Sequence, residues 1–143
     1  LYFHPGRAPV FKAQSYVGNT CHMFDRLLAA LSSDVEGRVF YLCDYPKRSV
    51  AEWATAIQRS TGARRIPTVP RALLRVVARV GDLAMRFGWA DPPLSTRRYH
   101  NMLVEAPYPV ERTERVVGPL PHTLESGVAE TVRWLRDEHA WNS

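Results

Sequence analysis

One polar segment of the sequence has the side chains that a ligand pocket needs. Residues 95–102, "STRRYHNM", place Arg97, Arg98 and Asn101 beside hydroxyl groups and an aromatic ring. An arginine can grip a phosphate or a carboxylate with two parallel hydrogen bonds. We therefore expect these three side chains to contact an anionic small molecule, although an exposed helix would have the same composition.

A second candidate set lies near the N-terminus. Residues 2–9, "YFHPGRAP", carry His4 and Arg7 in a stretch rich in proline, and loops at strand ends often hold ligand contacts. Lys12 and Tyr16 follow on an expected strand, near the end of the sheet that would bind a ligand. An ordinary turn followed by routine strand residues explains the same pattern, so both interpretations stay open.

Three arginines are expected to share one face of a helix. Arg71, Arg75 and Arg79 are spaced four residues apart, which places them on the same side. A solvated face opposite an apolar one is the commonest reason for such spacing, and a surface for nucleic-acid phosphates or an anionic membrane is the alternative. The net charge of +5 favours anionic ligands in general, but the charges are spread along the chain.

The sequence lacks the compact motifs that mark a catalytic site. Its eight glycines never form the Gly-x-Gly-x-x-Gly turn of a dinucleotide site, and a P-loop is absent. No lysine follows a tyrosine by four positions, and neither a His-Glu-x-x-His zinc motif nor a Gly-x-Ser-x-Gly elbow occurs. We therefore expect no catalytic residue, no metal site and no cofactor bound by this chain alone.

Composition indicates a globular protein of one domain. The chain has 143 residues, 45% of them hydrophobic and 23% charged, and no apolar run approaches the roughly 18 residues of a membrane span. Cys21 and Cys43 match neither a metal site nor a redox pair, so we expect two buried thiols in a reducing cytoplasm. The start at Leu1 suggests processing or a longer parent chain.

Apolar patterning predicts alternating strands and helices. The expected strands are 11–17, 38–43 and a short piece at 66–69, and the expected helices are 20–31, 49–62, 70–87, 95–104 and 121–141. This order is typical of crossover units on a parallel sheet in an α/β protein. Two or three strands cannot cover the apolar faces of four to five helices, so we infer that partner strands lie outside the chain.

Capping signals and apolar periodicity define the expected helices further. Thr20 and Thr123 are expected N-caps, Ser49 and Glu52 form a capping box, and Gly62 supplies a stop. The expected core positions are Met23, Phe24, Leu27, Leu28 and Leu31 in the first helix, Leu73, Leu74, Val76, Val77, Val80, Leu83, Ala84 and Phe87 in the third, and Leu124, Gly127, Val128, Thr131, Val132, Trp134 and Leu135 in the last.

Three segments in order resemble extended short-chain dehydrogenases/reductases. "SYVGNTCHMFDRLLAAL" resembles a strand that ends in Val-x-Asp or Val-x-Asn and opens a helix, with Asn19 where Asp is commoner. "GRVFYLCDYPKRSVAEWATAIQRSTG" resembles the next strand and helix. "GPLPHTLESGVAETVRWL" resembles the closing pattern, which matches at Gly118, Pro121, Leu124, Glu125, Gly127, Thr131, Val132 and Trp134.

This resemblance implies that the chain is the C-terminal, helix-rich portion of a Rossmann-type extended fold. In that family the first half holds NAD(P) and a Tyr-x-x-x-Lys catalytic pair, and the second half shapes the substrate pocket. Residues 1–143 would then be the substrate-binding part of an NAD(P)-dependent enzyme, partnered by the missing N-terminal Rossmann portion. Family members are often homodimers, so the resemblance implies a dimer too.

Two features of the sequence narrow the choice of subfamily. "VPRALLRVVARVGDLAMRFGWADPPLSTRRYHNM" resembles a long insert of 3β-hydroxysteroid dehydrogenases and of some epimerase/dehydratase members. The Arg-Pro-Gly-Asp motif of sugar epimerases is absent, and "PVERTERVVG" departs from the pattern that follows it, which argues against a nucleotide-sugar substrate.

Two other functions compete with this interpretation. The chain could be a stand-alone basic module that binds nucleic acid or an anionic membrane through Arg71, Arg75 and Arg79. It could also be a non-catalytic family member that serves as an assembly surface. The leading interpretation expects no nucleic acid partner.

Overall fold

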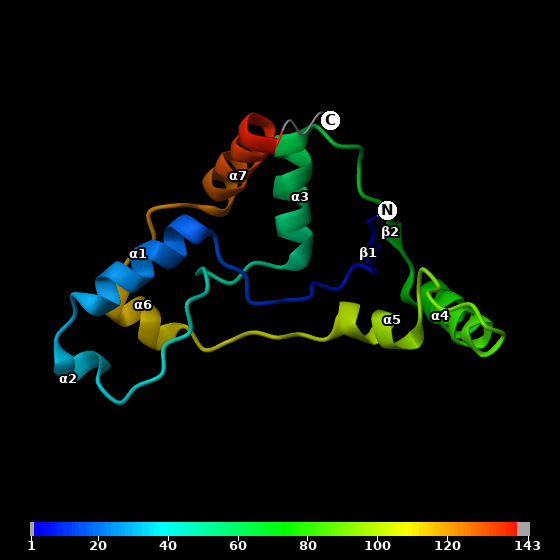
Figure 1. Ribbon diagram of the computed structural model, residues 1–143, viewed down its shortest axis with the longest axis horizontal. Helices are drawn as coiled ribbons and strands as arrows, with labels where there is room; N and C mark the ends of the chain where they lie inside the picture. Colours follow the sequence, from blue (N-terminus) through cyan, green and yellow to red (C-terminus); the bar gives the residue numbers. More distant parts are fainter. Residues whose placement is uncertain (1, 140–143) are drawn as a thin grey trace. The chain divides into compact units, whose positions relative to one another are not determined.

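The computed structural model describes residues 2–139. The chain divides into two compact units, one made of Leu1–Val10 and Arg65–Glu105 and the other of Phe11–Arg64 and Ala106–Ser143. The helices and strands of both units are labelled in Figure 1. Each unit has its own hydrophobic cluster, so each is built by its own packing.

The first unit contains the two strands of the described residues. β1 (His4–Pro5) pairs in parallel with β2 (Thr68–Val69), and the Gly6 amide donates to the Val69 carbonyl at 2.9 Å. The extended piece expected at 66–69 is therefore confirmed. The prediction that residues 2–9 form only a loop is wrong at β1. A strand of two residues is too short to show the alternating pattern from which a strand is predicted.

Two helices complete the first unit. α4 (Arg71–Arg86) begins directly after Pro70, and α5 (Thr96–Leu103) begins after Ser95, whose hydroxyl accepts from the Arg98 amide. Both expected helices are confirmed. Their cluster consists of Leu74 and Ala78 of α4, Leu94 of the connecting loop and Tyr99 of α5.

The expected core face of α4 is mostly exposed. Of its eight positions only Leu74 is buried and Ala84 is half-buried, whereas the other six are 42% to 84% exposed. The covered face is instead a narrow one formed by Leu74, Ala78 and Gly81, because α5 and its preceding loop approach from that side. The apolar periodicity predicted the helix correctly, but it predicted the wrong packing face.

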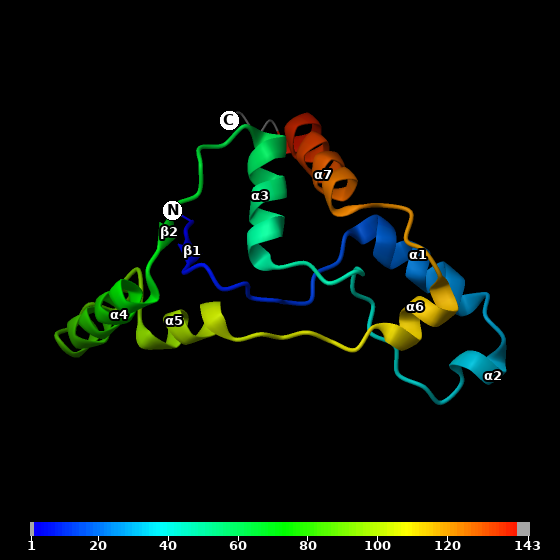
Figure 2. The ribbon, with the colours of Figure 1, turned by 180° about the vertical axis from the view of Figure 1, so that it is seen from behind.

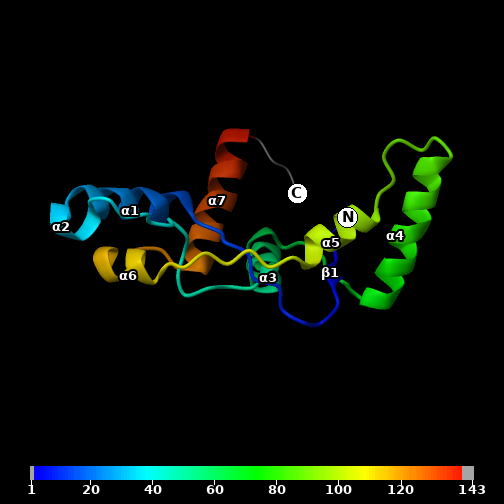
Figure 3. The ribbon, with the colours of Figure 1, turned by 90° about the horizontal axis from the view of Figure 1, so that it is seen from below.

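The second unit consists of five helices in the described residues: α1 (Val17–Leu28), α2 (Ser32–Val35), α3 (Val50–Thr61), α6 (Glu111–Val117) and α7 (Leu124–His139). α3 and α7 lie side by side in Figure 2, joined by Ala56, Val128 and Val132. α1 and α6 lie side by side in Figure 3.

α1 differs from the expected helix in its start and in its buried face. It begins at Val17, so Thr20 is not an N-cap; its hydroxyl donates to the Tyr16 carbonyl at 3.2 Å instead. Asn19 and Met23 are buried, whereas the expected core residues Phe24, Leu28 and Leu31 are exposed. The two expected buried thiols are also wrong: Cys43 is half-buried, and Cys21 is exposed because it lies half a turn away from Asn19 and Met23.

Three capping predictions are confirmed. The Ser49 hydroxyl accepts from the Glu52 amide while the Glu52 carboxylate accepts from the Ser49 amide, and Gly62 ends α3 with a φ of 72°. Thr123 precedes α7 and its hydroxyl accepts from the Ser126 amide at 3.2 Å. The end of the closing helix expected at Trp141 lies outside the described residues.

The strands expected at 11–17 and 38–43 are wrong. Phe11 and Lys12 make isolated bridges with Ser49 and Ala106, and residues 38–43 have no strand assignment. Val39 is 67% exposed, although its run was expected to be covered on both faces. A buried parallel strand needs a neighbour on each side, and the described residues supply none for this run.

The described residues thus form a mostly helical α/β chain with a small parallel sheet of two strands. Of the three expected strands only the piece at 66–69 is present, and β1 was not expected. The described residues contain seven helices rather than the expected four to five, because α2 and α6 were missed. Both are short, at four and seven residues. No helix of the described part is long and apolar enough to cross a bilayer.

Candidate functional site

The candidate site is a cavity of about 540 Å³ in the second unit. It lies against the loop that precedes α3, the end of α6 and the loop that precedes α7. Ligand pockets are typically about 300–1,000 Å³, so the cavity can hold a small molecule. Its polar lining comes from Asp44, Tyr45, Arg48, Glu114 and His122, and its apolar lining includes Trp53 and Leu124.

Asp44 holds one wall of this cavity in place. Its Oδ2 accepts from the Tyr16 amide at 3.1 Å, and its Oδ1 accepts from the Ser15 hydroxyl at 3.2 Å. The Asp44 amide in turn donates to the Gln14 carbonyl at 2.9 Å. Because both carboxylate oxygens are already bonded, Asp44 acts mainly to fix the loop before α3 against the segment before α1.

Tyr45 ties the same loop to the segment before α7. Its hydroxyl donates to the Gly118 carbonyl at 2.5 Å. Burial raises the pKa of Tyr45 above its ordinary value, and the negative charges of Glu114 and Asp44 raise it further. The phenol therefore stays protonated at neutral pH and serves as a hydrogen-bond donor rather than a base.

Arg48 places a cation at the cavity. Its Nη1 lies 3.1 Å from Glu52 Oε1, and the two side chains are 43% and 46% exposed. Hydrogen bonds from the amide and hydroxyl of Ser49 lower the pKa of Glu52, with Arg48 contributing less. An exposed pair one helical turn apart is weak, so an anionic ligand could displace Glu52 from Arg48.

His122 belongs to a cluster with Tyr16 and Glu130. The Tyr16 and His122 rings meet edge to face with centroids 5.0 Å apart, and His122 Nδ1 lies 3.4 Å from Glu130 Oε1. The Tyr16 hydroxyl donates to Glu130 Oε2 at 2.5 Å, and this bond is the main reason that the pKa of Tyr16 is raised. Tyr16 is therefore held as a protonated donor.

The buried side chain of Asn19 holds the backbone of His122 through two hydrogen bonds. The Asn19 Nδ2 donates to the His122 carbonyl at 3.0 Å, and the His122 amide donates to Asn19 Oδ1 at 3.1 Å. Asn19 is fully buried at 0% exposure. An amide side chain donates and accepts at the same time, whereas a carboxylate only accepts, so in this chain Asn19 makes one bond more to His122 than an aspartate would.

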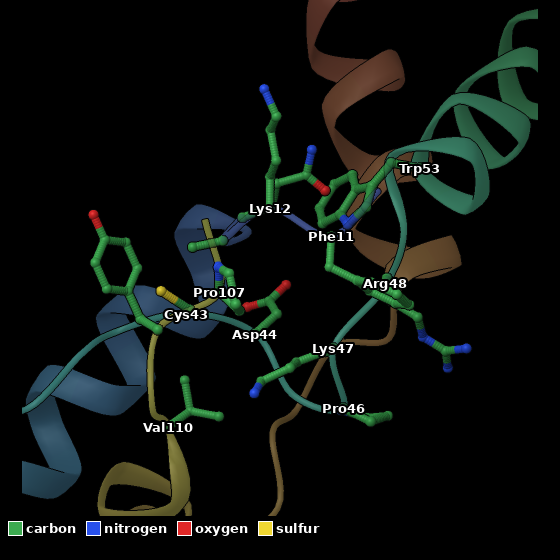
Figure 4. A pocket seen from close by; sticks show the side chains of 13 residues that line it. Phe11, Lys12, Cys43, Asp44, Pro46, Lys47, Arg48, Trp53, Pro107 and Val110 are labelled. Carbon is green, nitrogen blue, oxygen red and sulfur yellow. The ribbon is translucent and has the colours of Figure 1, made fainter. Parts of the chain in front are cut away.

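Lys12 and Tyr16 are the two sequence candidates of the second unit. Lys12 lines a small pocket with room for only about 20 Å³, no more than a single water molecule. Figure 4 shows its side chain extending away from Asp44 and Lys47. Tyr16 lines a mainly apolar cavity of about 440 Å³ that also contacts α3 and α7.

The other five sequence candidates lie in the first unit. His4 is half-buried on β1 with its ring against Tyr2, and Arg7 is exposed after Gly6. Arg97 and Asn101 lie one turn apart on an exposed face of α5. Arg98 braces its own loop, with Nη1 donating to the Pro92 carbonyl at 2.8 Å and Nη2 lying 2.7 Å from Asp91 Oδ1.

Sequence reasoning missed the residues that line or support the larger cavity, namely Asp44, Tyr45, Arg48, His122 and Glu130. One signal was available: Asp44 directly follows the apolar run 38–43, and ligand contacts gather after the carboxyl ends of parallel strands. His122 gave no signal of its own, because its position depends on Asn19, more than a hundred residues away in the chain.

Three comparisons with known proteins found no relative of this chain. No family model, no curated protein and no solved structure matches the chain. Among residues 2–139 no three histidine, cysteine, aspartate or glutamate side chains gather as a metal site.

Proposed function

We propose that the chain is the substrate-binding portion of an NAD(P)-dependent enzyme of the extended short-chain dehydrogenase/reductase family, acting as an epimerase, a dehydratase or a 3β-hydroxysteroid-type dehydrogenase. One observation carries the proposal. The three segments that resemble this family interlock within one unit. Asn19 of the first clamps His122 of the third, Asp44 of the second accepts from Tyr16 of the first, and Tyr45 of the second donates to Gly118.

The exposed apolar surface of this unit supports the same proposal. Val17, Phe24 and Leu28 of α1 and Val39 of the 38–43 run are 54% to 82% exposed. Val17, Phe24 and Leu28 share one face of α1, and a large apolar face left exposed marks a surface that another part covers. A sheet supplied by an N-terminal Rossmann portion would cover these helices and give residues 38–43 a neighbouring strand.

In this proposal the cavity of about 540 Å³ binds the substrate. Arg48 contacts an anionic or hydroxylated group, and Trp53 and Leu124 provide the apolar wall. Fixing the substrate in one orientation against the reacting groups is how such a portion contributes to rate. None of the sequence candidates lines this cavity. His4, Arg7, Arg97 and Asn101 stay proposed ligand contacts within the first unit, and Lys12 stays one at its own small pocket. Tyr16 and Arg98 are held by Glu130 and Asp91.

The described residues do not fit the nicotinamide cofactor itself. A dinucleotide is held where a glycine-rich turn joins a strand to the start of a helix. Here β1 is followed by a bend at residues 6–8 and not by a helix, and β2 leads through Pro70 into α4, whose first turn has no glycine. We therefore assign the cofactor and the Tyr-x-x-x-Lys pair to the N-terminal partner portion. The residues of this chain would bind the substrate and take no part in the reaction steps.

The family assignment is tested by sequencing the gene upstream of the Leu1 codon. We expect an open reading frame that encodes Gly-x-x-Gly-x-x-Gly and Tyr-x-x-x-Lys. A reading frame that begins at Leu1 would refute the assignment. Calorimetric titration of this chain with NAD(H) and NADP(H) is expected to show weak or no binding, and tight binding would contradict it.

The substrate site is tested separately in the complete enzyme. Arg48→Ala is expected to raise KM for the substrate by about tenfold or more, because a charged hydrogen bond contributes about 1.5–3 kcal/mol. Arg59→Ala is the matched control, since Arg59 is an exposed cation of α3, the helix that follows Arg48, and lies outside the cavity. Equal KM values for the two variants would show that Arg48 does not contact the substrate. The family assignment would be unaffected.

A further inference from the structure

We propose that α4 docks on an anionic lipid surface, lying in the plane of the headgroups with its apolar stripe inserted. The apolar stripe of α4 is defined as Leu73, Val76, Val77, Val80, Leu83 and Phe87. Each of these side chains is 42% or more exposed, and Phe87 reaches 84%. This inference is independent of the proposed enzyme function.

The stripe is continuous and is separate from the packed face of its helix. At 100° per residue its six side chains span about 120° of the helix surface. Leu74, Ala78 and Gly81 lie beside it and make the contact with α5 and its preceding loop. α4 can therefore insert the stripe while it stays packed in its own unit.

Positive charge flanks the stripe on the side away from Leu74, Ala78 and Gly81. The helix contains four arginines and one acidic residue, Asp82. Arg75, Arg79 and Arg86 are exposed, whereas the Arg71 Nε donates to the Pro5 carbonyl at 3.2 Å. The Asp82 carboxylate accepts from the Thr96 amide at 3.0 Å, which holds it against α5.

An anionic membrane contacts the apolar stripe and the arginines on its flank at the same time. Nucleic acid would neutralise Arg75 and Arg79 but would leave the stripe in water. A second copy of the chain would cover the stripe but would bring no counter-charge to the arginines. A helix with a wide apolar stripe, a basic polar face and aromatic residues is the kind that lies in a membrane interface. Phe87 and Trp89, 56% exposed, supply aromatic side chains just after the end of α4.

The test is sedimentation of the full chain with vesicles. We expect binding to vesicles of phosphatidylcholine mixed with phosphatidylglycerol and much weaker binding to phosphatidylcholine alone. Val80→Ser/Leu83→Ser should lower the partition coefficient at least about tenfold, because burying a Val or Leu side chain is worth about 1.5–3 kcal/mol. Arg75→Gln/Arg79→Gln should lower it about fivefold for each arginine removed.

The matched control is Leu28→Ser/Leu31→Ser, which removes two leucines that are 82% and 73% exposed in the second unit. It should bind vesicles like the unchanged chain. Circular dichroism of each variant checks that its helix content is retained.

Three outcomes would overturn the proposal. The first is no binding to the anionic vesicles. The second is equal loss of binding in the control and in Val80→Ser/Leu83→Ser. The third is a dimer in sedimentation equilibrium that Val80→Ser/Leu83→Ser dissociates, without vesicle binding by the unchanged chain, which would assign the stripe to a second copy.

Discussion

At the scale of single residues, a few buried polar contacts join distant segments of the chain. Asn19 is the clearest example of such a contact. Its side chain is fully buried, donates to the His122 carbonyl and accepts from the His122 amide. Replacing one member of such a pair leaves a buried polar group without its partner, which costs more than the bond itself contributes.

We predict that Asn19→Asp destabilises the second unit by about 2–4 kcal/mol at neutral pH, because a buried carboxylate would face the His122 carbonyl. Burial raises the folded-state pKa of the new carboxyl above its unfolded value of about 3.9. The destabilisation should therefore be complete above the folded-state pKa and fade as the pH falls toward 3.9. Urea unfolding at several pH values measures this, and a loss that does not change with pH would contradict it.

At the scale of elements, helix caps were the most reliable sequence signal. The Ser49–Glu52 box, the Gly62 stop and the Thr123 cap are all present, because a cap depends on residues within one turn of each other. The interpretation of Thr20 as a cap failed because Val17 already begins α1 beside the bonded pair of Tyr16 and Asp44.

We predict that Glu52→Gln destabilises the second unit by about 0.5 kcal/mol at neutral pH through loss of the charged part of the cap. The folded-state pKa of Glu52 is lowered, so its charge contributes stability above the unfolded pKa of about 4.3 and loses it as the pH falls through the folded-state pKa. The difference between the two proteins should therefore vanish in acid.

Thermal unfolding across this pH range measures the Glu52 effect. Glu36→Gln is the control, because Glu36 is an exposed carboxylate at the C-terminal end of a one-turn helix. A difference that persists in acid would show that the charge of Glu52 has no part in the cap.

Gly81 marks the closest approach of α4 to the loop that precedes α5. A Cβ at this position would collide with the Leu94 carbonyl oxygen, so Gly81→Ala should destabilise the first unit by about 2 kcal/mol although alanine favours helix. Ala72→Gly, at an exposed position of the same helix, should cost only about 1 kcal/mol. Urea denaturation compares them, and a stabilised Gly81→Ala protein would refute the close approach.

At the scale of the whole molecule, each of the two compact units has its own cluster: Leu74, Ala78, Leu94 and Tyr99 in the first, and Ala56, Val128 and Val132 in the second. We predict that Asn19→Asp raises amide hydrogen exchange only in Phe11–Arg64 and in 106–139, and that Gly81→Ala raises it only in the other unit. Mass spectrometry of exchange measures this, and a rise throughout the chain in both variants would show one cooperative unit instead.

What the sequence determined is local. Residues close in the chain set the helices at α3, α4, α5 and α7 and most of their caps, because backbone hydrogen bonds and caps form within one or two turns. The α/β class follows from the same patterning, as does the expectation that the apolar faces exceed what two or three strands can cover.

What only the tertiary structure decided is which apolar faces are covered and which polar groups meet. Leu74 is buried while Leu73 is exposed, although periodicity treats both as core. His122 meets Asn19 and Tyr16 across more than a hundred residues, and no spacing rule reports such a contact. The runs at 11–17 and 38–43 have the composition of strands but not the structure, because a strand exists only through hydrogen bonds to a neighbour.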